Sequence, residues 1–122
     1  MIQGTLGDEG ELLFEISLIT DNGFELPVDA LLDTGFSGWL AMNDQDLDGL
    51  DWTYVKQEKM RTAKGEFNFD LYVGKVRIEE REFDIPVHVG AGVPEILICR
   101  QLLKNRRLVV DISAGVLTLE AS

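Results

Sequence analysis

The chain has only one cysteine, one histidine and three prolines among its 122 residues. One cysteine excludes an intrachain disulfide and gives no indication of an oxidising compartment. One histidine without a nearby cysteine pair gives no zinc site. No apolar run approaches the roughly 20 residues that span a membrane, and the N-terminus lacks a basic, apolar leader pattern. We therefore predict a cytoplasmic protein that has no membrane contact, no metal and no cofactor.

Basic residues are also scarce. Eleven Lys and Arg stand against twenty-two Asp and Glu, which gives a net charge of −11. A surface that binds phosphates needs a basic stripe, and none is visible, so the composition argues against a nucleic-acid partner. The acidity is compatible with a cationic partner, but it more often serves solubility.

Length and patterning predict one all-β domain over residues 1–122. Apolar residues alternate with polar ones in many short segments separated by turn residues, which is typical of a mainly antiparallel barrel or sandwich. We expect strands at residues 12–18, 24–33, 39–42, 52–62, 67–78, 83–89, 95–98, 108–112 and 116–119. Helix is expected only as about one turn at 43–47 and at 100–105.

The most informative stretch is an apolar run, residues 30–32, that leads into Asp33, Thr34 and Gly35. A carboxylate at the end of a buried strand needs specific partners. The Thr34 hydroxyl can join a hydrogen-bond network, Gly35 lets the backbone turn sharply, and Ser37 can donate a hydrogen bond. The alternative is a plain turn between two strands, because Asp-x-Gly is common in turns.

A second apolar run, residues 96–99, enters Arg100-Gln101-Leu102-Leu103. The two motifs in this order resemble the retropepsin-like aspartic peptidases (clan AA), and in particular a microbial subgroup with Asp-Thr-Gly-Phe. The resemblance spans about residues 12–119 and implies a closed barrel with one short helix in the C-terminal half. Two positions depart from the pattern: Cys99 stands where the family usually has Gly, and Phe36 stands where it usually has a small residue.

The resemblance implies an aspartic endopeptidase with Asp33 as its catalytic residue. Peptide hydrolysis by carboxylates needs two of them, one protonated and one ionised, yet the chain has a single Asp-Thr-Gly. A homodimer supplies the second Asp33, and the pair would activate water against a peptide or protein substrate. Thr34, Gly35 and Ser37 would support the loop, and Arg100 would tie the second loop to the first by a buried ion pair or backbone contacts.

The polar segment Ala63, Lys64, Gly65 and Glu66 lies between two strand patterns. In the family it corresponds to a flap that closes over substrate. The alternative is an ordinary hairpin loop. For the whole protein, the alternative function is a catalytically inactive peptide-binding or dimerisation module, which Cys99 and Phe36 favour.

Three other features receive structural interpretations. His88 is out of phase with the apolar residues around it, so it is predicted to face solvent. Cys99 is predicted to be inert packing rather than a thiol nucleophile. An acidic segment lacks the last glutamate of an EF-hand loop, where Val55 stands, so it is predicted to be solvated rather than to bind calcium. Its residues are Asp44, Asp46, Asp48 and Asp51.

Overall fold

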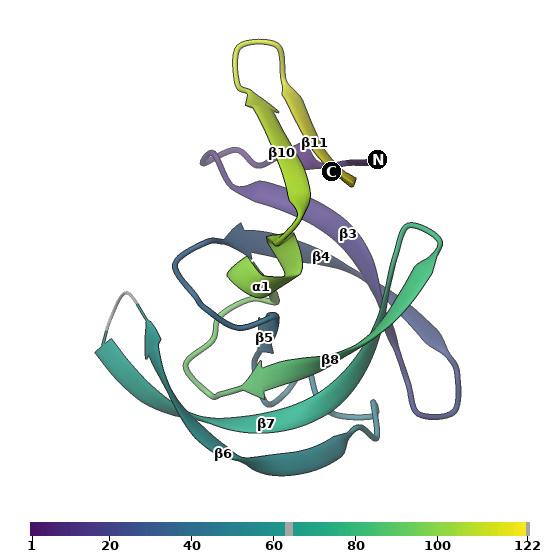
Figure 1. Ribbon diagram of the computed structural model, residues 1–122, viewed down its shortest axis with the longest axis vertical. Helices are drawn as coiled ribbons and strands as arrows, with labels where there is room; N and C mark the ends of the chain where they lie inside the picture. The colour runs from purple at the N-terminus through teal and green to yellow at the C-terminus, as the bar shows by residue number, and fades with distance from the viewer. Residues whose placement is uncertain (63–64, 122) are drawn as a thin grey trace.

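The computed structural model describes residues 1–62 and 65–121, which form strands and one short helix (Figure 1). The elements are β1 (Ile2–Gln3), β2 (Thr5–Leu6), β3 (Leu12–Ile19), β4 (Glu25–Asp33), β5 (Leu40–Met42), β6 (Thr53–Thr62), β7 (Gly65–Ile78), β8 (Arg81–Val89), β9 (Leu97–Cys99), α1 (Arg100–Leu103), β10 (Arg106–Asp111) and β11 (Val116–Ala121).

Six of the strands close into a barrel. Their order is β3-β4-β9-β5-β8-β7, and β7 returns to pair with β3. The β4–β9 and β5–β8 pairs are parallel, whereas the other pairs around the barrel are antiparallel. Strand β6 continues the sheet beyond β7, and β2 continues it beyond β3. The prediction of an all-β, mainly antiparallel closed barrel with one short helix is confirmed.

A second, three-stranded sheet has the order β1-β11-β10. Its β10–β11 hairpin projects from the barrel at the top of Figure 1. Several apolar side chains near the hairpin tip are exposed, namely Leu108, Val110, Ile112 and Val116. Exposed apolar residues gathered on a projecting element are typical of an interaction surface.

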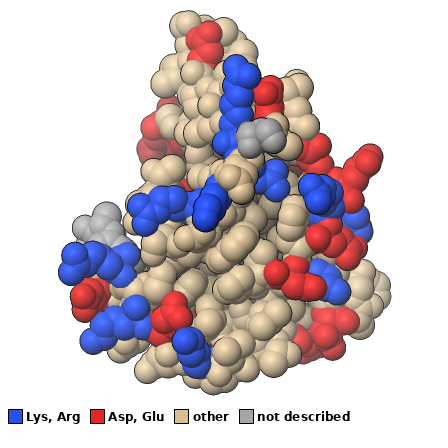
Figure 2. All heavy atoms as spheres, in the orientation of Figure 1, with Lys and Arg blue, Asp and Glu red and all other residues tan. Residues whose placement is uncertain are grey.

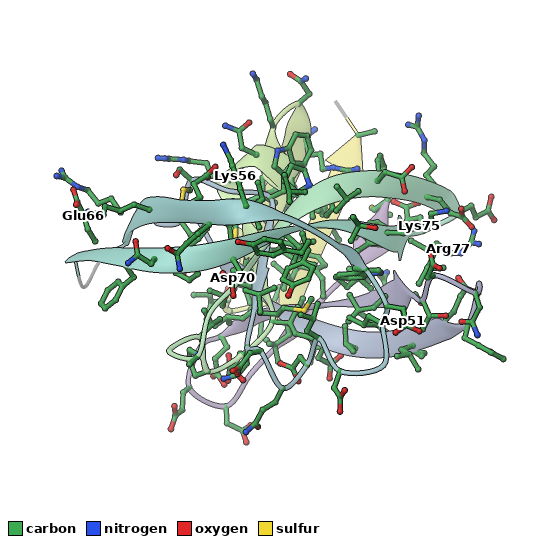
Figure 3. The ribbon with its side chains drawn as sticks, turned by 90° about the horizontal axis from the view of Figure 1, so that it is seen from below. Asp51, Lys56, Glu66, Asp70, Lys75 and Arg77 are labelled. Atoms are coloured by element: carbon green, nitrogen blue, oxygen red, sulfur yellow. The ribbon has the colours of Figure 1, made fainter. Side chains whose placement is uncertain are left out.

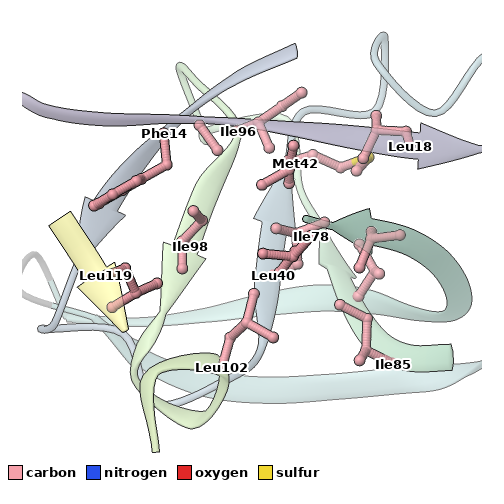
Figure 4. Packing of buried hydrophobic residues seen from close by; sticks show 14 of the residues in the cluster. Phe14, Leu18, Leu40, Met42, Ile78, Ile85, Ile96, Ile98, Leu102 and Leu119 are labelled. Atoms are coloured by element: carbon pink, nitrogen blue, oxygen red, sulfur yellow. The ribbon is translucent and has the colours of Figure 1, made fainter. Parts of the chain in front are cut away.

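The main core fills the barrel, because alternate residues of its strands point inward. Phe14, Ile16 and Leu18 of β3 are all buried. Figure 4 shows Leu40 of β5 and Leu102 of α1 inside the barrel, so the helix closes one part of this core. A separate, smaller cluster lies next to the Asp33 turn and consists of Phe36, Ala41, Phe69, Val93, Leu97 and Cys99.

Charged side chains lie mostly around the margins of the face shown in Figure 2, where its lower centre carries uncharged residues. The acidic excess of the chain therefore does not cover the surface evenly on this side of the molecule. Salt bridges such as those of Arg77 with Glu25 and Glu82 lie on exposed parts of the sheet.

The predicted helical turn at 43–47 is wrong. The segment forms consecutive turns with hydrogen bonds such as Asp46 N–H to the Asn43 carbonyl oxygen. The Asn43 side chain also accepts from the Gln45 backbone N–H. Asn and Asp side chains that bind nearby backbone in this way compete with helix. Helix α1 also ends before the predicted position 105, because Lys104 at its C-terminus has an extended backbone, and Asn105 follows with a φ of 64°.

The predicted exposure of His88 is wrong as well, since its side chain is 4% exposed. The neighbouring Val87 and Val89 point into the main core, as the alternation predicts. His88 points to the opposite face of β8, which Phe36 and Phe69 cover. Strand β8 is buried on both faces at this end, so alternation could not reveal the burial of His88.

Candidate active site

Asp33 is the last residue of β4, where the strand runs parallel to β9 and Asp33 pairs in register with Cys99. The Asp33 side chain is half-buried. Its Oδ1 accepts a hydrogen bond from the Gly35 backbone N–H at 2.9 Å. This Asx turn fixes the position of the carboxylate, which lines the groove described below.

The two loops predicted from the sequence lie against each other. The backbone N–H of Arg100 donates to the Phe36 carbonyl oxygen at 3.0 Å, and the Gln101 N–H donates to the Gly38 oxygen at 2.9 Å. These are N–H groups of the first turn of α1, which have no partner within the helix. The Asp33 loop therefore supplies the carbonyl groups that satisfy the start of α1.

Arg100 was expected to join the two loops through an ion pair or through backbone contacts, and the backbone contact is present. The Arg100 side chain is exposed and forms no salt bridge within the described residues. Thr34 is exposed and Ser37 is half-buried. Within residues 1–62 and 65–121, neither hydroxyl has a hydrogen-bond partner, so their roles in supporting the loop stay predictions.

An apolar groove of about 490 Å³ has Asp33 in its lining. Its walls come from β4, the Asp33 loop, the start of β7 and the segment from Gly90 to Leu97. Asp33 is the only ionisable residue among those that line it, in the part of the chain that the structure describes. The apolar lining includes Leu31, Phe36, Phe67, Phe69, Val93, Pro94 and Leu97.

Phe36 and Cys99, which depart from the family pattern, are both accommodated. Phe36 is 3% exposed and packs edge-on against Phe69, with ring centroids 5.4 Å apart. It therefore forms part of the groove wall. Cys99 is fully buried, and its backbone N–H donates to the Trp39 carbonyl oxygen. Burial, followed by the nearby Asp33 charge, raises the pKa of the Cys99 thiol, which argues against a thiolate nucleophile.

The predicted flap falls between the end of β6 at Thr62 and the start of β7 at Gly65. Ala63 and Lys64 lie outside the described residues. Gly65 begins β7 with a φ of 118°, which favours glycine. Glu66 is exposed and lies 3.6 Å from the Arg61 guanidinium. Figure 3 shows Glu66 at one end of the long β6–β7 hairpin, with Lys75 and Arg77 toward the other.

The acidic segment borders a separate hollow of about 520 Å³, together with Trp52 and Tyr72. Within the described ranges, no group of three or more His, Cys, Asp and Glu side chains could hold a metal ion. None of the helices described is long and apolar enough to cross a membrane.

Sequence reasoning missed two features beside Asp33. The first is the contribution of Phe67 and Phe69 to the groove, although their alternation correctly predicted a strand. The second is a buried His88 that bonds to Glu58 of β6, with Nε2 and Oε1 2.9 Å apart. No pattern in the sequence links residues 58 and 88.

The closed barrel, with an Asp-Thr-Gly turn at the end of β4 and a short helix after β9, is the retropepsin-like fold. A retropepsin-like aspartic protease from Rickettsia conorii is similar to this chain with a TM-score of 0.68 and 22% identity, over 98% of this chain and 89% of that one. EIAV protease, solved with the inhibitor HBY-793, also gives a TM-score of 0.68, with 16% identity over 87% of this chain and 99% of that one. No family model and no curated protein matches the sequence.

Proposed function

We propose that the protein is a retropepsin-type aspartic endopeptidase that hydrolyses peptide bonds as a homodimer. The observation that carries the proposal is the position of Asp33 as the only ionisable residue described in the lining of the apolar groove. Hydrolysis by carboxylates needs two of them with different protonation states. A second copy of the chain, related by a two-fold axis, is the source of the other Asp33.

In this mechanism the two Asp33 carboxyl groups hold one proton between them, because two like charges at short distance do not both ionise. The ionised group takes a proton from a water molecule as its oxygen attacks the peptide carbonyl carbon. The protonated group donates its proton to the carbonyl oxygen. Exposed Thr34 and Gly35 follow Asp33 and would face the equivalent loop of the second copy.

The groove supports a peptide substrate with a large apolar side chain next to the scissile bond. Phe67 and Phe69 of β7 line the groove, and so do Val93 and Leu97. Burial of an apolar side chain there would contribute about 1.5–3 kcal/mol to binding. The predicted flap, residues 63–66, would close over the peptide and exclude water.

The exposed apolar residues of the β10–β11 hairpin are our candidate for part of the contact with the second copy. Ile112 is 76% exposed at the tip of this hairpin. A projecting hairpin with such residues would lose apolar surface to water on dimerisation. The cytoplasmic location stays a prediction from the sequence.

A catalytically inactive peptide-binding or dimerisation module is the second candidate. The register of Cys99 beside Asp33 favours it, because the thiol adds bulk where the family usually has no side chain. The two candidates differ in whether a peptide bond is broken.

Incubation with a peptide library between about pH 4 and 7, analysed by mass spectrometry, tests the proposal. We expect cleavage beside large apolar residues, inhibition by a statine peptide and no cleavage by Asp33→Asn. Uncleaved peptides that nevertheless bind in the groove would support the inactive module. Cleavage retained in pure Asp33→Asn would place the chemistry elsewhere.

A further inference from the structure

His88 lies directly beneath the loop that carries Asp33. Its ring packs edge-on against Phe36 and Phe69, with centroid separations of 5.5 Å and 6.1 Å. Gly38 also lies against the ring, because a Cβ built on it would lie 2.8 Å from His88 Nδ1. The ring therefore fills the space under both Phe36 and Gly38. Since interiors are close-packed, the position of this ring determines where the loop can rest.

The ring is held from the other side by Glu58 of β6. The His88 Nε2 and Glu58 Oε1 atoms are 2.9 Å apart. This hydrogen bond is the largest cause that lowers the pKa of Glu58, and Lys56 lies 3.5 Å from the other carboxylate oxygen. An ionised carboxylate only accepts hydrogen bonds, so His88 Nε2 carries a proton and donates it.

The second ring nitrogen, Nδ1, has a different environment. Nδ1 is buried and without a hydrogen bond in the part of the chain that the structure describes. Its side of the ring faces Gly38 rather than solvent. The single bond to Glu58 is therefore the only polar contact described that fixes the rotation of this ring.

Glu58 belongs to β6, which pairs with β7 in the β6–β7 hairpin. It pairs in register with Phe69 of β7, and Phe69 itself contacts the His88 ring. A continuous set of contacts thus runs from β6 through Glu58 and His88 to Phe36 and Gly38. Figure 3 marks Lys56, two residues before Glu58, on the ribbon of β6.

We propose that His88 is a positioning residue for the Asp33 loop and that Glu58 orients it, so that the pair couples the β6–β7 hairpin to the catalytic carboxylate. The inference rests on the proposed peptidase activity, because it assigns a role within that same site. A role in stability alone would lower the melting temperature and leave kcat per folded molecule unchanged. A positioning role changes kcat and moves the loop.

Substitutions of Glu58 test the proposal without opening a cavity in the core, because its side chain is 30% exposed. Glu58→Ala removes the hydrogen bond to His88, whereas Glu58→Gln removes the charge and keeps an oxygen that accepts it. The matched control is Glu82→Ala on β8, where the carboxylate pairs with Arg77 on an exposed surface away from the Asp33 loop. Glu82→Ala removes the same charge and one ion pair.

We expect Glu58→Ala to lower kcat about tenfold with KM changed less than about twofold, the scale expected for a misplaced catalytic group. Glu58→Gln should recover most of this loss, and Glu82→Ala should match the wild type. The backbone amide resonances of Gly35 and Gly38 should shift in Glu58→Ala and stay in place in Glu82→Ala. A wild-type kcat together with unmoved loop resonances in Glu58→Ala would overturn the proposal.

The amide resonances test the positioning role of His88 independently of the peptidase activity. If the wild type cleaves no peptide, the proposed function fails, but the Gly35 and Gly38 amides still decide the positioning role. Movement of both amides in Glu58→Ala alone supports the role. Equal movement in Glu58→Ala and Glu82→Ala contradicts it, because the effect would then follow charge rather than the contact with His88.

Discussion

Replacement of Gly38 by alanine measures how tightly the Asp33 loop packs on His88. The new Cβ would lie 2.8 Å from His88 Nδ1 and 2.9 Å from Phe36 Cε1. Both distances are shorter than real Cβ contacts allow, so both rings or the Gly38 backbone must move. His88 and Phe36 are 4% and 3% exposed, which means that neither ring can swing into solvent. Overpacking of this kind costs about 1–3 kcal/mol of stability.

Thermal unfolding followed by circular dichroism provides the assay. In a domain of this size, each kcal/mol corresponds to roughly 4 °C, so Gly38→Ala should lower Tm by roughly 4–12 °C. Gly92→Ala is the control for stability, because no atom lies within 4 Å of the position of its Cβ. It should leave Tm unchanged or raise it slightly, since alanine restricts the unfolded chain.

The role of His88 in this cost is isolated by a double-mutant cycle with His88→Ala. Removal of the ring eliminates one of the two close contacts, so the double variant should be less destabilised than the sum of the single variants. We expect the difference to exceed about 0.5 kcal/mol. Additive effects, or a Gly38→Ala protein that melts with the wild type, would refute the packing of the loop on this ring.

Three further results are expected. Two Asp33 carboxyl groups that share a proton bind more protons in the dimer than apart, so dimerisation measured by sedimentation should tighten as pH falls toward about 5. The Asp33→Asn dimer should be tighter at neutral pH and depend less on pH. An equal pH dependence of the two proteins would show that the two carboxylates do not meet at the interface. Ile112→Asp should weaken the dimer, measured by light scattering, without loss of fold. The control Phe24→Asp, at an exposed position between β3 and β4, should leave the dimer intact. Equal effects of the two substitutions would exclude the β10–β11 hairpin as part of the dimer contact. The pKa of Glu58 is lowered from 4.5, so its contribution to stability is present above pH 4.5 and lost as pH falls through the lowered pKa. The free energy of unfolding in urea should therefore depend less on pH for Glu58→Gln than for the wild type over this acid range. Parallel pH dependences of the two proteins would contradict the lowered pKa.

The barrel could be predicted because its strands keep a simple pattern. In β3, Phe14, Ile16 and Leu18 alternate, and the structure buries all three. In β4, an apolar run ends at one carboxylate, and a carboxylate in such a position needs hydrogen-bond donors nearby. The backbone N–H of Gly35 is one such donor to Asp33. Local rules were sufficient wherever a strand had one buried face and one exposed face.

The surroundings of Asp33 could not be predicted, because they depend on contacts between distant segments. The contact of the Asp33 loop with the N–H of Arg100 was expected only from the resemblance to a known family, because side-chain patterns do not encode a backbone contact. His88 was predicted to face solvent because its strand alternates, yet Phe36 packs over that face. A strand buried on both sides violates the alternation rule, and here the violation lies beside the candidate site.

The short β1 and β2 strands also escaped the sequence patterns, because two residues are too few to show a period. They form only by pairing with β11 and β3, which lie elsewhere in the chain. The helical turn expected at 43–47 failed for the opposite reason. Its residues offer hydrogen bonds to nearby backbone, and these produced consecutive turns.

Mixing wild-type protein with Asp33→Asn tests the central claim most directly, namely that catalysis needs one Asp33 from each of two chains. The two forms are mixed, allowed to exchange subunits and assayed for cleavage of a peptide identified from the library. In an equal mixture about a quarter of the dimers carry two intact Asp33 residues. If both are required, activity should follow the square of the wild-type fraction. Activity in direct proportion to that fraction would show that each chain acts alone and would contradict the account.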